Sequence, residues 1–317
     1  MKNLSKLPHN PELALEVRGL VKSYGKVKAL RGIDLQVRQG EIFGFLGPNG
    51  AGKTTTIRCL LDMIRPDAGS IRLLGISPQS DPVAVQTLTG YLPGEVQYYE
   101  NMTAERQLRF YGNMRNGSTD WNYARELAER LSLDTKQAIK NLSKGNKQKI
   151  AVIQALMHHP KILLLDEPTS GLDPLMQQEV LAMLREANAA GATVFFSSHI
   201  MSEVENLAER VAIIRLGEIV ETAETSVLTG RSMRHLTVRL KRPVSLHSLE
   251  NLPGVGVISC PDDTSFTLQV TGDMEQLVKV LGGYPVVDLE TDHPSLEETF
   301  LAYYKKSSHA LDRENNT

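Results

Sequence analysis

The feature that constrains this chain most is a glycine-rich turn, GPNGAGKTT, at residues 47–55. An apolar run, Glu41–Leu46, precedes the turn, and Gly52–Ile64 has the pattern of a helix that ends before Pro66. Glycines let the backbone curl until successive N–H groups converge, and the N-terminus of the following helix adds positive partial charge at the same place. The pattern G-x-x-x-x-G-K-T between a strand and a helix therefore predicts a loop that binds phosphate groups.

Two side chains of this loop have a predicted chemical role. Lys53 supplies a mobile cation for the β- and γ-phosphates of a nucleotide, and the Thr54 hydroxyl is expected to ligate Mg²⁺. A glycine loop that matches the pattern by chance is expected in only about 1% of chains of this length. The predicted nucleotide-binding residues of the loop are Gly47, Pro48, Asn49, Gly50, Ala51, Gly52, Lys53, Thr54 and Thr55.

The segments after the loop predict an α/β fold. Ile162–Asp166 and Thr193–Ser197 are unbroken apolar runs typical of buried strands, and Pro174–Ala190 between them has the pattern of a helix. Val211–Thr222 is expected to form a hairpin that turns at residues 216–217. Uninterrupted apolar strands that alternate with helices indicate a parallel sheet covered on both faces.

A mostly helical block separates the loop from those later strands. It extends from Asp81 to Pro160, where Thr103 and Asp120 are good N-caps for two amphipathic helices. A third helix is expected to begin after Ser143 and to stop before the proline. We interpret this block as an insertion beside the parallel sheet.

The length of 317 residues favours about two domains at roughly 150 residues each. We predict a tail at 1–12, a first domain at 13–222 with a helical subdomain at about 92–160, a small C-terminal α+β domain at 223–306, and a polar tail at 307–317. The elements expected in the C-terminal domain are strands at His235–Leu240, Val255–Cys260, Ser265–Val270 and Val286–Leu289, and helices at Leu246–Leu252, Met274–Leu281 and Ser295–Tyr304.

Composition excludes several other classes of protein. Hydrophobic residues make up 41% and charged residues 23%, which is ordinary for a globular chain, and the net charge of −2 leaves no strongly basic footprint for nucleic acid. The two cysteines, Cys59 and Cys260, lie far apart in the sequence and favour a reducing cytosol. No apolar run approaches the roughly 20 residues that cross a bilayer, so we expect the chain itself not to span a membrane.

Four further motifs follow in a fixed order. They are NLSKGNKQK at 141–149, KILLLDEP at 161–168, SGLD at 170–173 and SSH at 197–199. Together with the phosphate loop, this ordered set resembles the ATPase subunit of ABC transporters over about residues 13–222. The resemblance implies a P-loop NTPase fold of the ABC cassette type, which has a mixed sheet core with an antiparallel β edge and a helical subdomain.

The resemblance also assigns roles to residues outside the loop. Tyr24 is expected to stack on the adenine of ATP, and Asp166 is expected to hold Mg²⁺ together with Thr54. Glu167 is placed beside the γ-phosphate, where it orients the attacking water, and His199 matches the switch histidine of the family. With Lys53, the last two are the predicted catalytic residues.

The segment LSKGN resembles the family's L-S-G-G-Q signature, in which Ser143 and Gly145 bind ATP. In this family two cassettes pair head to tail, so each ATP lies between Lys53 of one cassette and Ser143 of the other. A chain with one loop and one signature is therefore expected to work as a homodimer or heterodimer. The implied partner is a separate membrane permease, docked near Gln97–Met102 and holding the chain at the inner face of the cell membrane.

Two departures from the family pattern affect the site. Lys144 and Asn146 replace a glycine and a glutamine of the signature, and Gly94 occupies the position of a loop glutamine. Either Glu95 takes over the contacts with Mg²⁺ and water, or this loop senses nucleotide differently. Both departures resemble a bacterial branch of daunorubicin- and bacitracin-resistance ATPases, as does the C-terminal sequence SLEETFLAYY at 295–304.

The predicted function is thus to power export of a drug-like or amphiphilic solute through the permease, with no nucleic-acid partner. The alternative is a soluble ABC ATPase that acts on a non-transport partner such as the ribosome. Those proteins usually carry two tandem cassettes or a long coiled coil, and this sequence has neither. The C-terminal domain carries no cluster of chemically active residues, so we expect it either to tether two cassettes or only to stabilise the chain by packing.

Overall fold

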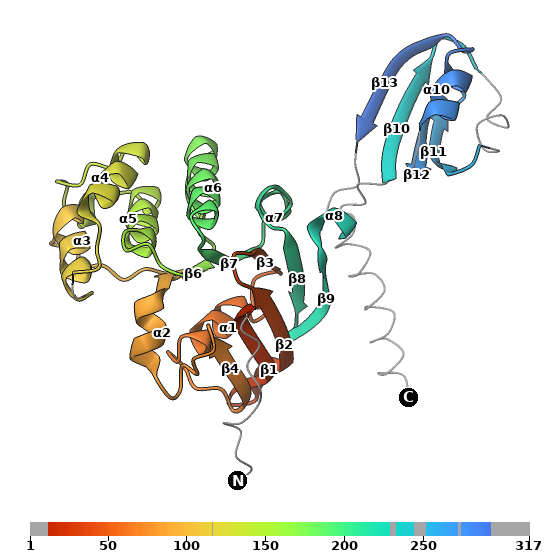
Figure 1. The fold of residues 1–317 in the computed structure, drawn as a ribbon. Helices are drawn as coiled ribbons and strands as arrows, with labels where there is room; N and C mark the ends of the chain where they lie inside the picture. The colour runs from red at the N-terminus through yellow and green to blue at the C-terminus, as the bar shows by residue number, and fades with distance from the viewer. Residues whose placement is uncertain (1–11, 116, 229–232, 244–251, 272–273, 293–317) are drawn as a thin grey trace. The chain divides into compact units, whose positions relative to one another are not determined.

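The computed structural model describes residues 12–115, 117–228, 233–243, 252–271 and 274–292, shown in colour in Figure 1. The chain divides into two compact units, Met1–Ala223 and Glu224–Thr317. None of the helices in the described ranges is long and apolar enough to cross a membrane.

The first unit combines two sheets with helices. Its strands are β1 Leu13–Tyr24, β2 Val27–Arg38, β3 Ile42–Leu46, β4 Ala68–Leu73, β5 Thr89–Leu92, β6 Ile162–Asp166, β7 Thr193–Ser198, β8 Arg210–Arg215 and β9 Glu218–Glu224. Its helices are α1 Lys53–Leu60, α2 Pro82–Leu88, α3 Ala104–Asn113, α4 Trp121–Arg130, the 3₁₀ turn η2 Ile139–Asn141, α5 Lys144–Leu156, α6 Pro174–Ala189 and α7 Met201–Leu207.

The larger sheet has six strands in the order β5-β6-β7-β3-β8-β9, and its pairs β5–β6, β6–β7, β7–β3 and β3–β8 are parallel. Every residue of β3, β6 and β7 is buried, as expected for strands covered on both faces. The predicted parallel sheet is therefore confirmed. The register pairs Asp166 with Ser197 and Leu46 with Ser198, so the carboxyl ends of β3, β6 and β7 lie level at one edge.

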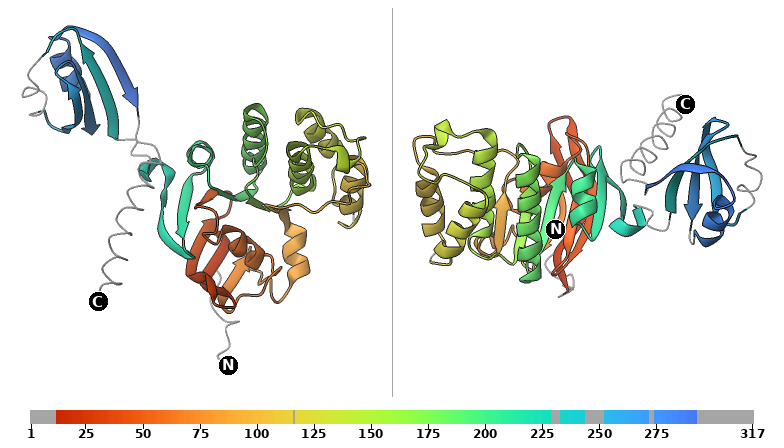
Figure 2. Two further views of the ribbon diagram at one scale, coloured as in Figure 1. Left: turned by 180° about the vertical axis from the view of Figure 1, so that it is seen from behind. Right: turned by 90° about the horizontal axis from the view of Figure 1, so that it is seen from above.

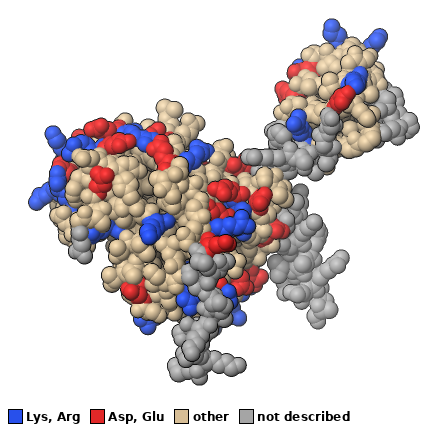
Figure 3. Space-filling model, in the orientation of Figure 1, with Lys and Arg blue, Asp and Glu red and all other residues tan. Residues whose placement is uncertain are grey.

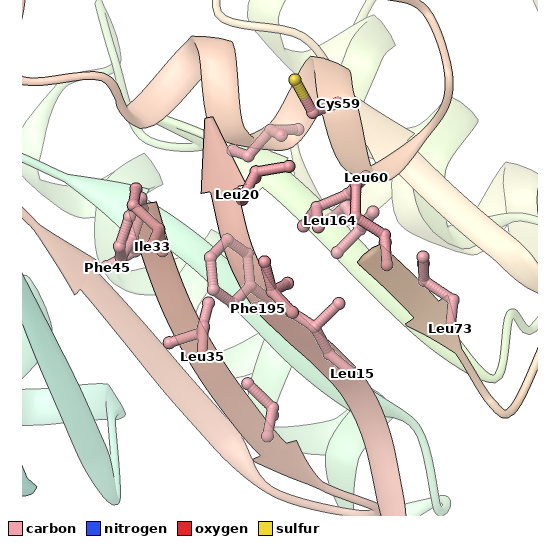
Figure 4. Packing of buried hydrophobic residues seen from close by; sticks show 14 of the residues in the cluster. Leu15, Leu20, Ile33, Leu35, Phe45, Cys59, Leu60, Leu73, Leu164 and Phe195 are labelled. Carbon is pink, nitrogen blue, oxygen red and sulfur yellow. The ribbon is translucent and has the colours of Figure 1, made fainter. Parts of the chain in front are cut away.

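The smaller sheet is antiparallel, with the order β2-β1-β4. Helix α1 contacts β2 and β4 on one side and β6 of the larger sheet on the other, so it lies between the two sheets. Figure 4 shows the core that results, in which Leu20, Ile33, Leu60, Leu164 and Phe195 come from five different elements. Burial of this apolar surface fixes the start of α1 against the carboxyl ends of the parallel strands.

The helical block carries α3, α4 and α5, which Figures 1 and 2 show gathered at one end of the first unit. The side chains of Thr103, Asp120 and Ser143 accept hydrogen bonds from backbone N–H groups of the first turns of these helices, so the three predicted caps are confirmed. Helix α5 contacts β5, α3 and α4 and so joins the block to the sheet.

The expectation of a mostly helical Asp81–Pro160 segment missed the edge strand β5. Four residues are too few to show a periodicity, and the sequence TGYL has no apolar run. The strand needs Gly90, because a Cβ atom there would lie 2.2 Å from the carbonyl oxygen of Ala155 in α5. Helix α7 was also not predicted from the sequence.

The second unit begins with the short helix α8 Thr225–Leu228 and forms a four-stranded antiparallel sheet in the order β11-β12-β10-β13. The bounds are β10 Met233–Leu240, β11 Val255–Asp262, β12 Ser265–Thr271 and β13 Val286–Asp292, with helix α10 Glu275–Leu281. Leu236, Phe266, Leu268 and Leu277 pack in one core, which confirms the predicted α+β composition. The helices expected at 246–252 and 295–304 lie, apart from Leu252, outside the described residues, as does the tail at 307–317.

Acidic and basic side chains are interspersed on the face of the first unit seen in Figure 3. Arg109 pairs with Glu105 within α3. Arg130 of α4 pairs with Glu179 and Glu186 of α6. Charged side chains of these three helices therefore pair with one another instead of forming a field of one sign.

Candidate nucleotide site

The phosphate loop joins β3 to α1, and its shape depends on glycine. Gly50 and Gly52 have φ angles of 79° and 115°, a region that favours glycine over other residues. At Gly47, a Cβ atom would lie 2.5 Å from the carbonyl oxygen of Ile214, because β8 passes directly behind the loop. The backbone can therefore curl against the sheet only with glycine at these positions.

Lys53 points back into this curl. Its ammonium donates to the carbonyl oxygens of Gly47 at 2.7 Å and Pro48 at 3.2 Å, and its Nζ lies 3.5 Å from Oε1 of Glu167. The side chain is only 5% exposed, and this burial lowers the pKa of Lys53, although Glu167 and Asp166 favour its charged form. The loop thus holds a largely desolvated cation, an arrangement suited to receiving an anion.

Asp166 joins the loop to the parallel sheet. Its Oδ2 accepts a 2.6 Å hydrogen bond from the Thr54 hydroxyl, and its Oδ1 accepts a 2.5 Å bond from the Ser197 hydroxyl. The carboxylate is 1% exposed, so these donors offset the cost of burying it.

The hydroxyl oxygen of Thr54 and the carboxylate of Asp166 fit a Mg²⁺ ion bound together with a nucleotide. Mg²⁺ prefers oxygen ligands and usually takes one or two from the protein, with the rest from phosphates and water. The hydroxyl of Thr54 and the carboxylate of Asp166 supply such a pair. Within the described ranges, no three His, Cys, Asp or Glu side chains converge as a separate metal cage.

Glu167 has an unusual backbone for a residue that is not glycine, with a φ angle of 52°. Its N–H donates to the carbonyl oxygen of Ser197 at 3.2 Å, while its Oε1 lies 3.0 Å from Nδ1 of His199 and 3.5 Å from Nζ of Lys53. Left-handed backbone of this kind persists where surrounding structure enforces it and is common at active sites. The fold therefore brings the three predicted catalytic side chains together.

Gln148 belongs to this region, although no motif in the sequence singles it out. This buried side chain of α5 donates to the carbonyl oxygens of Glu167 at 3.1 Å and Pro168 at 3.0 Å. It thereby fixes the chain just after β6 to α5, the helix that Ser143 caps. The available signal was a polar residue before an apolar helical run, which is too common to identify a site.

Ser143 and Gly145 lie at the start of α5. The Ser143 hydroxyl accepts from the N–H of Asn146 at 3.2 Å, and a Cβ atom on Gly145 would lie 2.7 Å from the carbonyl oxygen of Gly171. The methylene carbons of Lys144 cover Gly171 from the other side. No hydrogen bond or ion pair among the described residues joins Ser143 or Gly145 to residues 47–55 of the same chain.

Tyr24 ends β1 beside the turn at Gly25. Its side chain is 48% exposed, and the Lys22 ammonium lies 5.7 Å from the centre of its ring. Lys22 is in turn paired with Asp67 at 2.9 Å. The tyrosine thus has exposed ring surface, and its stacking on adenine remains a prediction.

Gly94 and Glu95 follow β5. A Cβ atom on Gly94 would lie 2.9 Å from Oδ2 of Asp166, so the chain passes directly over the carboxylate that Thr54 contacts. Glu95 is exposed and lines a pocket of about 510 Å³ with Arg58, Tyr91, Gln97, Tyr111 and Gln154 among its walls. None of the described hydrogen bonds joins Glu95 to Thr54 or Asp166, and its role as a metal ligand remains a prediction.

The neighbouring tyrosines differ in their surroundings. The Tyr98 hydroxyl donates to the carbonyl oxygen of Lys147 in α5, and burial raises its pKa. The Tyr99 ring is 53% exposed and packs edge-on against Phe110 with centroids 5.4 Å apart. Of the pair, Tyr99 has the more exposed ring.

A phosphate loop after β3, an Asp-Glu pair at the end of β6, a histidine after β7 and a helical block beside the sheet define an ATP-binding cassette. The family model described as "ABC transporter" matches residues 30–170. The chain is 31% identical over 302 residues to a linearmycin resistance ATP-binding protein of Bacillus subtilis, covering 90% of this chain and 97% of that one. It is 32% identical over 302 residues to a daunorubicin resistance ATP-binding protein of Streptomyces coeruleorubidus, covering 92% and 95%.

A bacitracin transport ATP-binding protein of Bacillus licheniformis is 36% identical over 229 residues, which are 71% of this chain and 74% of that one. The solved structure of an ATP-binding subunit of an ABC transporter matches with a TM-score of 0.63 at 29% identity, covering 69% of this chain and 92% of that one. The chain therefore belongs to the ABC transporter family, as an ATP-binding subunit that hydrolyses ATP. The resemblance inferred from the motifs is confirmed.

Proposed function

We propose that this chain powers a separate permease that exports a drug-like or amphiphilic solute. The observation that carries the proposal is the extent of the likeness to the linearmycin and daunorubicin resistance proteins. It spans 90% and 92% of this chain and so includes the second unit as well as the cassette.

The geometry supports distinct roles around ATP. Lys53 contacts the β- and γ-phosphates in exchange for its present carbonyl partners, while Glu167 holds the attacking water and His199 keeps the Glu167 carboxylate in place. Thr54 and Asp166 hold Mg²⁺, and Tyr24 stacks on the base. When bound, the ion neutralises charge on the phosphate oxygens as the bond to the leaving group breaks.

The active form in this proposal is a head-to-tail dimer, either of two identical chains or of two related ones. The support is that Ser143 caps a helix of 13 residues, while none of the hydrogen bonds or ion pairs of the described residues joins it to the phosphate loop of its own chain. The N-terminus of that helix attracts anions, and in the dimer it faces the γ-phosphate on the partner's loop. Hydrolysis removes this shared ligand, so the dimer opens.

The proposed contact with the permease is the surface beside Gln97. The pocket that includes Glu95 and Gln97 shares Tyr111 and Gln154 with a second pocket of about 560 Å³, which also includes Met114. The shared side chains place the two pockets side by side, and we treat them as one groove that borders α2, α3 and the segment after β5. A short cytoplasmic helix of the permease fits this groove and places the chain at the inner face of the membrane.

We also propose the domain assignment that follows from this function. Residues 13–222 form the cassette, with its helical subdomain at about 92–160, and residues 223–306 form an accessory domain. The accessory domain tethers two cassettes when nucleotide leaves. Its contribution is a higher effective concentration of one cassette near the other, which requires no chemically active group.

Co-expression with candidate multi-helix permeases tests the proposal. We expect cells that carry both proteins to survive higher concentrations of amphiphilic antibiotics, and cells with Glu167→Gln in place of the wild type to lose this gain. ATPase activity should rise with membranes that contain the permease. Unchanged susceptibility, with ATPase activity stimulated by ribosomes instead of by these membranes, would favour the non-transport alternative.

A further inference from the structure

A buried carboxylate lies behind the catalytic residues, on the first turn of α7. Glu203 is 5% exposed, and it accepts hydrogen bonds from the Thr169 hydroxyl at Oε1 and from the Ser198 hydroxyl at Oε2, the latter at 2.7 Å. Both donors are themselves buried and neutral. Because a buried carboxylate is costly unless it is hydrogen-bonded, both contacts contribute to keeping Glu203 in this position.

The two donors come from the two segments that carry the catalytic side chains. Thr169 lies two residues after Glu167, and Ser198 immediately precedes His199. The same segments meet again nearer the surface, where Oε1 of Glu167 lies 3.0 Å from Nδ1 of His199. Glu203 is thus a second, buried link between the chain after β6 and the chain after β7.

Ser198 extends this link to the phosphate loop. Its carbonyl oxygen accepts from the N–H of Gly47 at 3.3 Å, and its hydroxyl oxygen accepts from the N–H of Ile200 at 2.9 Å. The single hydroxyl proton of Ser198 has two acceptors within reach, Oε2 of Glu203 at 2.7 Å and the carbonyl oxygen of Ile200 at 3.2 Å, and the contact with the carboxylate is the shorter. Ser198, which Glu203 contacts, therefore holds the backbone of Gly47 before α1 and of Ile200 just after His199.

We propose that Glu203 is a positioning residue for ATP hydrolysis, which fixes the separation of Glu167 and His199. It also links the segment at 170–173, which begins directly after Thr169, to the histidine. An apolar side chain of similar volume would fill this space without the cost of burying a charge, so packing alone gives no reason for a carboxylate here. The inference rests on the proposed roles of Glu167 and His199.

Three substitutions test this role by steady-state kinetics of the full chain. Glu203→Leu removes both acceptors, and we expect kcat to fall about 10- to 100-fold while KM for ATP changes by less than about twofold, since small misplacements of catalytic groups reduce rates on this scale. Glu203→Gln keeps one acceptor and can donate to Ser198, so it should recover most of the rate. Ser202→Ala, at an exposed position of the same turn, is the matched control and should leave kcat unchanged.

A double-mutant cycle separates positioning from general loss of structure. If Glu203 acts through the histidine, His199→Ala combined with Glu203→Leu should be no slower than His199→Ala alone. The proposal would be overturned if kcat of the double variant fell by the product of the two single reductions. It would also be overturned if Glu203→Leu had normal kcat while His199→Ala was slow. Normal turnover in His199→Ala would instead reject the proposed role of the histidine itself.

Folding of each variant is checked by ATP binding and by fluorescence of Trp121, the one tryptophan in the chain. If Glu203→Leu does not fold, Thr169→Val takes its place, because it removes one donor and preserves side-chain volume. The same fall in kcat, with the same lack of additivity to His199→Ala, is then expected. Full activity of a folded Thr169→Val variant would overturn the proposal.

Discussion

The Thr54 hydroxyl and the Asp166 carboxylate are joined by a 2.6 Å hydrogen bond, although 112 residues separate them in the chain. Thr54 lies in the first turn of α1, and Asp166 ends β6. Their meeting depends on the level carboxyl ends of β3, β6 and β7 and on the burial of α1 between the two sheets. The ligands proposed for Mg²⁺ are thus placed by the core of the cassette rather than by one local motif.

Removal of the threonine hydroxyl should weaken the response to Mg²⁺. For Thr54→Ala we expect the concentration of Mg²⁺ that gives half-maximal ATPase activity to rise about tenfold or more, because contacts with charged groups contribute about 1.5–3 kcal/mol. Thr54→Ser keeps the hydroxyl and serves as the control. A magnesium titration of the three proteins measures this, and identical curves would remove Thr54 from the metal site.

Glu167 and Lys53 should affect different steps. Glu167→Gln is expected to bind ATP but to lower turnover by about 10²–10⁴-fold, because the amide occupies the same space without accepting a proton. An ATP-bound dimer should then accumulate, visible by sedimentation.

Lys53→Ala should weaken nucleotide binding itself, as measured by titration. Rapid turnover by Glu167→Gln, or hydrolysis by a proven monomer, would contradict the proposed mechanism.

The loop after β5 gives a prediction about two adjacent residues. Gly94→Ala should lower Mg²⁺-dependent turnover by about 10- to 100-fold, because the added Cβ would lie 2.9 Å from Oδ2 of Asp166 and displace that carboxylate.

Glu95→Ala should lower turnover, with ATP affinity preserved, only if Glu95 binds the metal or the water. An unchanged rate for Glu95→Ala in the presence of the permease would reject that role.

His158 should make the stability of the cassette depend on pH. The ring is buried, its Nε2 lies 3.2 Å from the carbonyl oxygen of Thr89, and burial, with a smaller effect from Arg115, lowers its pKa from 6.5 to about 4. Above pH 6.5 the folded and unfolded states both carry a neutral ring. Between pH 6.5 and 4 the unfolded state binds a proton that the folded state does not, so stability falls as pH falls.

The size of this effect is about 3 kcal/mol by pH 4. It is measured by urea unfolding followed by fluorescence of Trp121, which lies in the first unit. His158→Gln should lose this part of the pH dependence. The difference between the two proteins in free energy of unfolding at pH 8, where the histidine is neutral in both states, is the value against which the difference at lower pH is compared. Parallel stability curves from pH 8 to pH 5 would show that His158 does not contribute.

Truncation after Glu224, where β9 ends, tests the tether. The truncated cassette should still bind ATP, because the phosphate loop and its neighbours all lie in the first unit. If the second unit tethers two cassettes, the shortened protein should dimerise more weakly than the full chain in the absence of nucleotide. Equal dimerisation in sedimentation experiments would leave the second unit only a role in packing.

The sequence alone determined those features that depend on neighbouring residues. The phosphate loop, the helix caps at Thr103, Asp120 and Ser143, and the buried strands β6 and β7 were predictable because turn geometry, capping and apolar runs act over a few residues. The ordered motifs also identified the family, because their order and spacing are kept even where Lys144 and Asn146 depart from the signature.

Only the tertiary structure decided which of these residues meet. The strand β5, the support of Glu167 by Gln148 and the link from Glu203 to Thr169 and Ser198 have no local signal. They arise from the parallel register and from α5 and α7 packing on the sheet, contacts that join residues up to 34 positions apart for Glu203. Long-range burial sets such distances, and a pattern of neighbouring residues does not encode them.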